Sequence, residues 1–414
     1  MSDQVTSLVD HYFRNEYGNA VSYLTAKFGK QHLELAEDAV QEALFKAMKN
    51  WSYSKVPNNP SGWIVTVASN KMIDHLRRAT RLEESNATDP EPVVHQEIDL
   101  ESIQDDVVKM MFACCHPSLS TEHQIILTLK ILGGLSVKEI ARALLKKEET
   151  IAKSYTRAKQ KFKNENIQLE LPQPVEIKNR LSTVLHIIYL LFNEGYKTTN
   201  GNELLKKDLC QEAIRLNGIL LENNDCNTSI ANALMALMYF HSSRFDARVD
   251  KEGYLITLEF QNRSLWNQNY IQKGIEYLEK ATKGAFINEF YLQATISGLH
   301  CEAKHYDETK WSDILELYDT LTRLNPSPVV KLNRIVALGK AKSPNDALKE
   351  LKQLETNPQI ENHYLYYAIK GEFLIESGSL KEGKQATLKA ISLTNNTAEK
   401  QYLMKKLEVL SESK

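Results

Sequence analysis

The sequence predicts an all-α protein of two or three domains. Apolar residues recur at helical spacing over almost the whole chain, whereas period-2 runs bounded by hairpin turns are scarce. The length of 414 residues fits two or three domains at about 150 residues each. Hydrophobic residues make up 42% and charged residues 25% of the chain, which is the composition of a folded globular protein and excludes global disorder.

Charge and cysteine content narrow the classes of function. The formal net charge is -2, so a nucleic-acid site has to be a local patch. The first residues carry acidic side chains and no apolar run, and no segment approaches the ~20 apolar residues of a spanning helix, so we expect a cytoplasmic protein without a membrane partner. Five cysteines without a CxxC pair favour neither a disulfide framework nor a zinc site. We expect Cys114 and Cys115 to be buried thiols.

Residues 34–50 are expected to form a helix with a polar edge. This edge consists of Glu34, Glu37, Asp38, Gln41 and Glu42. Such an edge is either solvated or a surface that grips a basic partner protein.

A second helix is expected over residues 63–78, after a polar loop at 52–61 that is placed to approach an extruded base. We expect Trp63, Val67, Ile73 and Leu76 to face inward; Trp63 alone fits a core better than a stacking platform. The outer face then carries Asn70, Lys71, Asp74, Arg77 and Arg78. Amide and acid groups among cations suit hydrogen bonds to bases and contacts to phosphates.

Residues 82–106 differ in composition from the segments beside them. They contain nine acidic residues, two prolines and no lysine or arginine. Like charges at this density repel one another, so the segment is predicted to be an extended linker.

Residues 136–163 show the pattern of a helix-turn-helix with a basic surface. One apolar stripe is Val137, Ile140, Ala141 and Leu144, and the second is Ile151, Tyr155, Ala158 and Phe162, with a turn at 145–150 between them. The segment holds nine basic and three acidic residues. Opposite the second stripe lie Glu149, Ala152, Lys153, Thr156 and Gln160, flanked by Arg157, Lys159 and Lys161. Short side chains permit approach to base edges and cations neutralise phosphates; the alternative is a solvated basic helix.

A proline pair at 171–174 marks a second boundary, and residues 175–414 are expected to be helical. A weak repeat begins at Ile314, Ala347 and Gly383, so 33 and 36 residues apart. Its further members are Tyr318 and Pro326, Leu351 and Pro358, and Thr387 and Asn395. The spacing is close to the ~34 residues of tetratricopeptide helix pairs, with an irregular helical domain as the alternative. Stacked pairs build an interaction surface rather than a catalytic cleft.

The sequence contains no nucleophile–base pair, phosphate loop or metal-ligand spacing. We therefore expect no catalytic residue, metal or cofactor. Glu194 beside Tyr196 suggests a catalytic acid, but we expect a helix end with Gly195 as its cap. Phe192 and Tyr196 then anchor the helix and Glu194 makes a structural hydrogen bond.

Three motifs in this order closely resemble bacterial sigma factors of the extracytoplasmic-function (ECF) group. They are "AEDAVQEALFKAMKNW", "GWIVTVASNKMIDHLRR" and "LSVKEIARALL...TIAKSYTRAKQKF", and the resemblance covers residues 6–163. Downstream, "FACCHPSLS", "LLFNEGY", "LCQEAIRLN" and "ALMALMYFHSSRFDARVDKEGYLITLEFQNRSLWN" are similar to the subgroup with a tetratricopeptide-like C-terminal extension.

The resemblance implies a domain order and partners. Residues 1–81 correspond to sigma region 2, 82–106 to the acidic linker, 107–170 to region 4 and 175–414 to a regulatory domain. Core RNA polymerase is the implied partner, through its β′ coiled coil and β flap. Docking on the coiled coil falls to Asp38, Gln41 and Glu42. The C-terminal domain is expected to contact the sigma core and modulate its activity.

The same resemblance assigns the DNA contacts to two helices. In the helix at 63–78, Asn70 and Asp74 are nearest the bases of the -10 element, and Lys71, Arg77 and Arg78 contact its phosphates. The helix at 149–163 reads the -35 element in the major groove. Its contact residues are Glu149, Lys153, Thr156, Arg157, Lys159 and Lys161.

This chain departs from the family at a few positions. A glycine near Leu145 and an arginine at Ser154 are absent, as are aspartates at Asn262 and Asn267 that members of the subgroup often have. One rival interpretation is a polymerase-independent regulator that binds an operator through residues 136–163 and an effector through its repeats. Another is a helical enzyme with an accessory DNA domain. Neither explains the pattern at residues 34–78.

Overall fold

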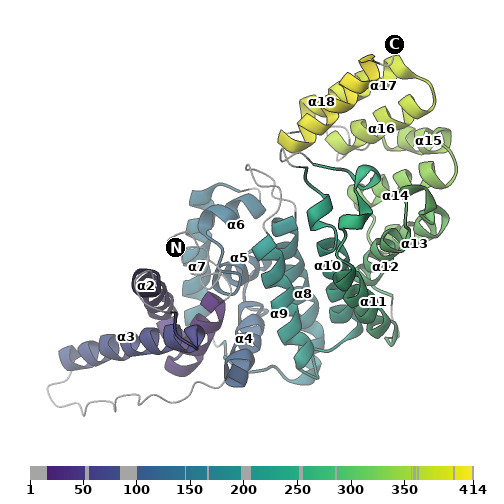
Figure 1. Ribbon diagram of the computed structural model, residues 1–414. Helices are drawn as coiled ribbons and strands as arrows, with labels where there is room; N and C mark the ends of the chain where they lie inside the picture. The colour runs from purple at the N-terminus through teal and green to yellow at the C-terminus, as the bar shows by residue number, and fades with distance from the viewer. Residues whose placement is uncertain are drawn as a thin grey trace. The chain divides into compact units, whose positions relative to one another are not determined.

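The computed structural model consists of helices joined by turns and loops (Figure 1), as the sequence predicts. The one β-bridge among the described residues joins Val249 to Leu255, outside any strand. The structure describes residues 16–51, 56–83, 100–144, 146–165, 167–196, 207–250, 255–284, 287–355, 357, 360, 363–394 and 397–412.

The chain forms two compact units. Unit 1 comprises Met1–Gly195 and Asp208–Cys226, and unit 2 comprises Tyr196–Lys207 and Asn227–Lys414. The boundary expected at residue 175 therefore differs from the observed division. The preceding helix ends at Asn164, before the proline pair, and Pro174 begins the next helix within unit 1.

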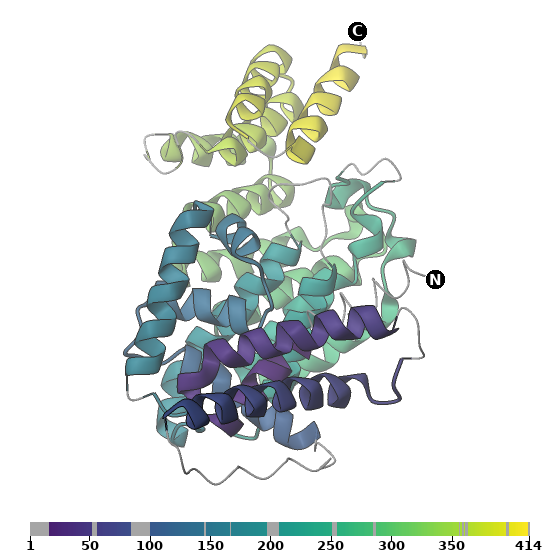
Figure 2. The same cartoon turned by 90° about the vertical axis from the view of Figure 1, so that its left-hand side faces the viewer.

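Unit 1 begins with a helix over residues 16–28, the short turn η1 (Lys30–His32), α2 (Leu33–Trp51) and α3 (Pro60–Glu83). Helices α2 and α3 lie side by side (Figure 2), and Trp51 packs against Trp63 with ring centroids 5.6 Å apart. The fully buried row of α3 is Ile64, Val65, Ala68 and Met72. Of the expected inward residues, Ile73 is buried and Trp63, Val67 and Leu76 are half-buried. The inward stripe is thus rotated by about one residue from the expected one.

Four helices follow in unit 1: α4 (Leu100–Cys114), α5 (Thr121–Ile131), α6 (Val137–Ala143) and α7 (Glu148–Asn164). The expected acidic linker at 82–106 overlaps the end of α3 and the beginning of α4, because Ile103 and Val107 start a buried helical stripe. Residues 84–99 of that segment lie outside the described residues. Cys114 and Cys115 are buried, as expected.

Helices α8 (Pro174–Tyr196) and α9 (Lys207–Glu222) complete unit 1 up to its boundary. Arg180 of α8 donates to the carbonyl of Phe112 and lies over its ring. Cys210 of α9 donates to the carbonyl of Phe192 at 3.4 Å. These contacts explain why α8 and α9 belong with the helices before them. The expected cap at Gly195 is wrong, since α8 continues through it to Tyr196, although Phe192 and Tyr196 are buried as expected.

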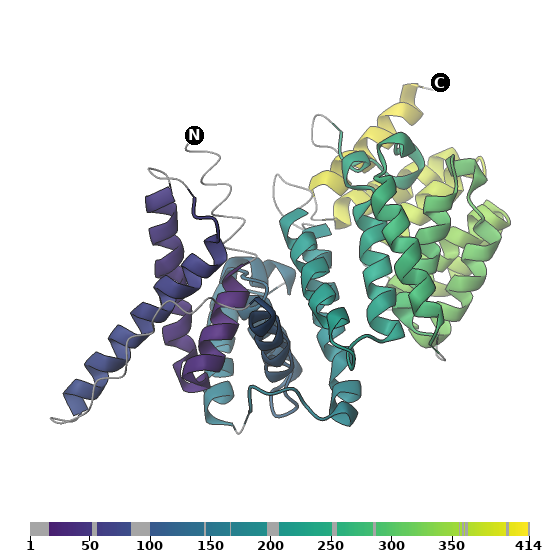
Figure 3. The same ribbon diagram turned by 60° about the horizontal axis from the view of Figure 1, so that its bottom comes forward.

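Unit 2 is a succession of helices in which neighbours in sequence pack against each other (Figures 1 and 3). Short turns interrupt it after α10 and α12. The helices are α10 (Ser229–Ser242), α11 (Gln268–Thr282), α12 (Glu289–Glu302), α13 (Trp311–Leu324), α14 (Pro328–Ala341), α15 (Pro344–Leu354), α16 (Tyr364–Glu376), α17 (Leu380–Leu393) and α18 (Thr397–Glu412). The turns are η2 (Phe245–Ala247), η3 (Leu258–Phe260), η4 (Arg263–Leu265) and η5 (Tyr306–Glu308).

The weak sequence repeat corresponds to alternate helices. Ile314, Ala347 and Gly383 are buried on α13, α15 and α17, so the repeat spans two helices. Helix α17 approaches α16 closely, since a Cβ on Gly383 would lie 3.1 Å from the carbonyl oxygen of Gly371. Pro358 and Asn395, the last members of two copies, lie outside the described residues.

Candidate nucleic-acid and polymerase interface

Helix α7 is built with one buried and one exposed face. Its buried side chains are Ile151, Tyr155, Ala158 and Phe162, the stripe expected from the sequence. Glu148 and Glu149 lie in the first turn, where the helix dipole favours acids, and Lys161 and Lys163 lie in the last. In the turn before α7, the Lys146 amide donates to the carbonyl of Ala141 at 2.8 Å; residue 145 lies outside the described residues.

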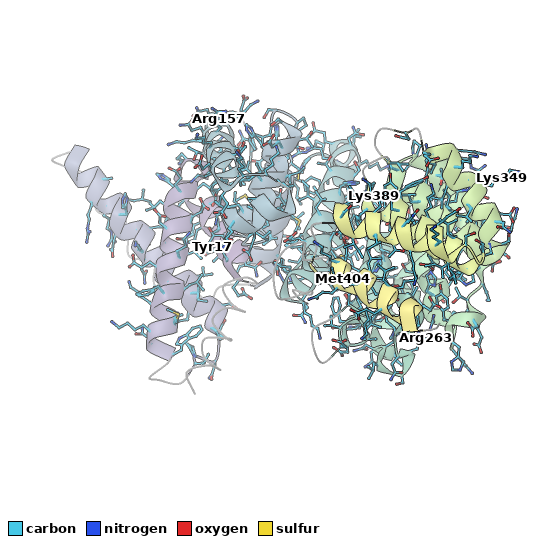
Figure 4. The ribbon with its side chains drawn as sticks, turned by 90° about the horizontal axis from the view of Figure 1, so that it is seen from above. Tyr17, Arg157, Arg263, Lys349, Lys389 and Met404 are labelled. Atoms are coloured by element: carbon cyan, nitrogen blue, oxygen red, sulfur yellow. The ribbon has the colours of Figure 1, made fainter. Side chains whose placement is uncertain are left out.

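The outer face of α7 carries the residues expected to contact DNA. Glu149, Ala152, Lys153, Thr156, Arg157 and Gln160 are exposed. Arg157 points away from the helices of unit 1 (Figure 4). Lys161 is half-buried. Ser154, which stands where the family often has arginine, donates to Glu122 at 3.2 Å. The exposed face combines short polar side chains with cations, the combination that suits base edges and phosphates.

Lys159 lies on the inner side of α7 and contacts α2. Its ammonium is 2.9 Å from Glu34 and 3.4 Å from Glu37. Glu37 is only 5% exposed and accepts hydrogen bonds from Tyr155 at 2.6 Å and Tyr17 at 3.0 Å. We call Tyr17, Glu34, Glu37, Tyr155 and Lys159 the Glu37 cluster. It joins the helix expected to read DNA to the helix expected to bind polymerase.

The Glu37 cluster is a satisfied network in which one carboxylate serves several donors. Burial raises the pKa of Tyr155 and of Tyr17, and the neighbouring Glu37 charge raises both further. Burial alone would lower the pKa of Lys159, but Glu34 and Glu37 outweigh it, so this pKa is raised. Sequence reasoning missed the cluster. A signal existed, because Glu37 lies four residues after buried Leu33 and three before buried Val40.

Helix α3 exposes part of its expected DNA face. Asn70, Asp74 and Arg78 are exposed and recur every four residues, so they form one stripe. Lys71 and Arg77 are half-buried. Lys71 makes an ion pair with Glu42 of α2. The pair joins one residue expected to bind phosphate to another expected to bind polymerase.

The outer face of α2 combines polar and apolar side chains. Asp38 and Gln41 are exposed, as a docking role requires, while Glu42 lies beside them and also pairs with Lys46 at 3.0 Å. Phe45 is 62% exposed and Met48 is 37% exposed on the same face. Sequence reasoning missed these two, whose spacing from Asp38 and Gln41 places all four on one side of the helix.

Three further observations concern the rest of the described chain. No group of three or more His, Cys, Asp or Glu side chains among the described residues could hold a metal ion. Among the described helices, none is both long and apolar enough to cross a membrane. Asn262 and Asn267 cap η4 and α11 with their side-chain oxygens, each accepting an amide at 3.1 Å. Asparagine caps about as well as aspartate, so the substitution preserves this local role.

Family models and a curated relative match the chain. Sigma-70 region 2 matches residues 13–82, Sigma-70 region 4 matches 109–162, and a family of unknown function, DUF6596, matches 180–282. The uncharacterized protein R00370 of Rhizobium meliloti (strain 1021) is 37% identical over 391 residues, which are 92% of this chain and 91% of that protein.

A shorter similarity points the same way. The RNA polymerase sigma factor YlaC of Bacillus subtilis (strain 168) is 23% identical over 147 residues, which cover 33% of this chain and 79% of that protein. No solved structure matches. Regions 2 and 4 are all-helical here and carry the exposed faces described above. The chain belongs to the family of the Rhizobium meliloti protein, and its Sigma-70 regions 2 and 4 indicate an RNA polymerase sigma factor for promoter recognition.

Proposed function

We propose that the protein is an ECF-type sigma factor whose α7 reads the -35 element and whose α3 captures the -10 element. The observation that carries this is the division of α7 into two faces. Ile151, Tyr155 and Phe162 are buried, while Lys153, Thr156 and Arg157 are exposed. A helix held by one face presents the other to a major groove, where short and cationic side chains contact bases and phosphates.

Helix α2 is the proposed docking surface for core polymerase. Asp38 and Gln41 supply polar contacts around exposed Phe45 and Met48. Exposed apolar side chains surrounded by polar ones are typical of protein interfaces. Glu42 contributes at the edge, where it also orients Lys71. The β′ coiled coil is the proposed partner of this face, and the β flap that of region 4.

Helix α3 is the proposed site of promoter melting. Asn70 and Asp74 contact bases of the non-template strand, and Arg78 contacts phosphate together with Lys71 and Arg77. Binding of extruded bases supplies the free energy for strand opening, so no nucleotide hydrolysis is required.

The Glu37 cluster holds α7 close to α2, and this closeness matters for binding the -10 and -35 elements at the same time. Elements centred near -10 and -35 are about 25 base pairs apart, on the order of 85 Å along B-DNA at 3.4 Å per base pair. In the cluster Tyr155 of α7 lies 2.6 Å from Glu37 of α2. We infer that α7 leaves α2 when polymerase and promoter bind, and that the cluster holds the protein in a closed resting state.

Unit 2 is the proposed regulator of this opening, acting in cis. Its stacked helices offer an interaction surface, and no separate anti-sigma protein is then required. This part of the proposal rests on unit 2 being compact and continuous with the sigma regions in one chain.

A reconstituted transcription assay tests the sigma function. The full chain is mixed with bacterial core RNA polymerase and promoter DNA, and run-off transcripts and co-purified polymerase are measured. We expect Asp38→Lys to reduce polymerase binding and transcription at least tenfold. Asp313→Lys is the matched control, because Asp313 is equally an exposed acid but lies on α13; it should behave as wild type.

The same protein, polymerase and DNA also distinguish a sigma factor from a regulator that works without polymerase. Specific binding of duplex DNA without polymerase, together with no binding of polymerase, would move the protein to the operator-binding class. The role of unit 2 is tested by truncation after residue 226, which keeps α8 and α9 in unit 1. Equal transcription by the truncated and full chains would contradict regulation in cis.

A further inference from the structure

Unit 2 contains a cluster of cationic side chains around one tryptophan. Arg244 follows α10 and Arg263 begins η4, and their guanidinium carbons lie 5.8 Å and 4.6 Å from the ring centroid of Trp266. Trp266 is buried at the end of η4. His300 is in the last turn of α12, and its carbonyl accepts from Arg263. We call Arg244, Arg263, Trp266 and His300 the arginine cluster; Arg263 is labelled in Figure 4.

Within the part of the chain that the structure describes, neither arginine of the cluster makes an ion pair. Arg244 donates to the Tyr196 hydroxyl and contacts His241 Nδ1, both at 2.9 Å. Arg263 donates to the carbonyls of His300 and Ala303. All of these hydrogen-bond acceptors are neutral, so among the described residues the two positive charges lie close together without an ion-paired acid.

Two other half-buried cations of unit 2 are paired with acids. Arg334 lies between Asp319 and Glu350, and Lys340 lies 2.7 Å from Glu376 and 3.5 Å from Glu372. Burial lowers the pKa of Arg263, and attraction of its charge to Glu308 opposes this in part, but both Glu308 and Asp246 make closer contacts of their own. Asp246 pairs with Lys207 at 2.7 Å and Glu308 accepts the amide of Lys304 at 3.2 Å. In this respect the arginine cluster differs from Arg334 and Lys340.

Several buried polar atoms of the cluster have no hydrogen-bond partner among the described residues. These atoms are Arg244 Nε, Arg263 Nη2, Trp266 Nε1 and His300 Nδ1. The first three can only donate, so each requires an acceptor. Leaving a buried donor unpaired costs about 1–3 kcal/mol, and more when it is charged. An oxygen-rich acceptor at this place would satisfy donors from the segments after α10 and in η4 together.

The arginine cluster carries two positive charges at neutral pH, because its two arginines are charged and its histidine is neutral. Burial lowers the pKa of His300 to about 3, and the charges of Arg244 and Arg263 add to the effect. The imidazole is thus neutral at pH 7. Burial also lowers the pKa of Arg263, but an arginine stays charged at neutral pH. A ligand of charge about -2 would balance the two guanidinium groups.

We propose that the arginine cluster is a binding site for a small molecule that carries a phosphate monoester. Such a group holds a charge of about -1.5 to -2 at pH 7 and three acceptor oxygens, which match two arginines and the indole N–H. A carboxylate brings one charge and two oxygens and would leave donors unpaired. Each guanidinium offers the ligand one unpartnered nitrogen, Arg244 Nε and Arg263 Nη2, through charge-assisted hydrogen bonds, and Trp266 lies against both groups.

The proposal goes beyond the sigma function and does not depend on it. It assigns to unit 2 a chemical signal that the stacked helices alone do not specify. If unit 2 regulates the sigma regions, phosphate-ester binding is the event to which that regulation responds.

Isothermal titration calorimetry of the full chain with inorganic phosphate tests the site. Sodium chloride keeps the ionic strength constant, and succinate serves as the dicarboxylate probe. We expect saturable binding of one phosphate per chain, with succinate at least tenfold weaker. Arg263→Gln and Arg244→Gln should each weaken phosphate binding at least tenfold. Arg323→Gln is the matched control, since Arg323 is an exposed arginine of unit 2 that contacts Thr320.

Each other result overturns the proposal. No saturable phosphate binding at millimolar concentration would mean that stacking on Trp266 alone accommodates the two arginines. Equal binding by wild type and both variants would place the phosphate elsewhere, and equal affinity for succinate would contradict the phosphate class. Circular dichroism checks the fold of each variant. If Arg263→Gln unfolds because it loses contacts to two carbonyls, phosphate binding by Arg244→Gln alone tests the proposal.

Discussion

The Glu37 cluster and the arginine cluster place buried charge in opposite situations. In unit 1, one carboxylate receives hydrogen bonds from Tyr17 and Tyr155 and an ion pair from Lys159. In unit 2, Arg244 and Arg263 share Trp266 and lack any such acceptor among the described residues. A buried charge is costly unless it is paired. The first cluster therefore joins parts of the fold, whereas the second is completed by something outside the chain.

Removing the shared acceptor should have the largest effect. Glu37→Ala removes the carboxylate that two buried hydroxyl groups share and leaves the Lys159 ammonium paired with Glu34 alone. Breaking a buried ion pair at one partner costs about 3–5 kcal/mol, and we expect that loss in the free energy of unfolding. Urea denaturation measures it. Asp38→Ala, at the next residue but exposed, should change stability by less than about 0.5 kcal/mol; equal effects would refute the importance of the cluster.

Loosening the same contact should have an intermediate effect. Tyr155→Phe removes the hydrogen bond to Glu37 and keeps the ring. Hydrogen bonds to charged groups contribute about 1.5–3 kcal/mol, so unfolding should become easier by that amount. If α7 must leave α2 to bind DNA, the variant should also bind -35 duplex more tightly in a mobility shift. Tyr23→Phe is the control, because among the described residues the Tyr23 hydroxyl accepts only one hydrogen bond, an exposed one from Lys27. Weaker DNA binding would contradict the closed resting state.

Removing a charge from the arginine cluster should cost less. Arg244→Gln loses hydrogen bonds to neutral Tyr196 and His241 but relieves the repulsion with Arg263. We expect a loss of about 1 kcal/mol or less in phosphate-free buffer, since an ordinary hydrogen bond contributes about 0.5–1.5 kcal/mol. Urea denaturation in the same buffer as for Glu37→Ala gives the comparison. A cost as large as that of Glu37→Ala would mean that Arg244 has a counter-charge within the protein.

The last prediction concerns the protonation of His300 in the unsubstituted protein. Its pKa in the folded protein, about 3, is below its value of 6.5 in the unfolded chain. Its contribution to stability is therefore complete above pH 6.5 and is lost as pH falls from 6.5 toward 3. NMR titration should show a neutral ring from pH 8 to pH 5, with assignment by His300→Asn. Arg244→Gln should raise this pKa. A ring that titrates near 6.5 would show that burial and the arginines have little influence.

Much of the fold was predictable because it follows from local periodicity. The buried stripe of α7 at Ile151, Tyr155, Ala158 and Phe162 was read directly from the sequence. The boundary at residue 175 was not, because a proline ends a helix but does not reveal what the next helix packs against. Arg180 and Cys210 hold α8 and α9 to unit 1 through contacts to distant carbonyls, and such contacts leave no periodic trace.

For the candidate site, the sequence determined which residues lie on which helix face. Spacing alone placed Asn70 and Asp74 outside on α3 and Thr156 and Arg157 outside on α7. The roles of these residues in binding promoter DNA stay predictions. Only the tertiary structure decided that Lys159 faces α2 and that Glu37 is buried. It also brought Arg244, Arg263 and His300 together around Trp266. Helical periodicity orients a side chain within its own helix, but charge pairing depends on which elements meet, and that is settled by packing of the whole unit.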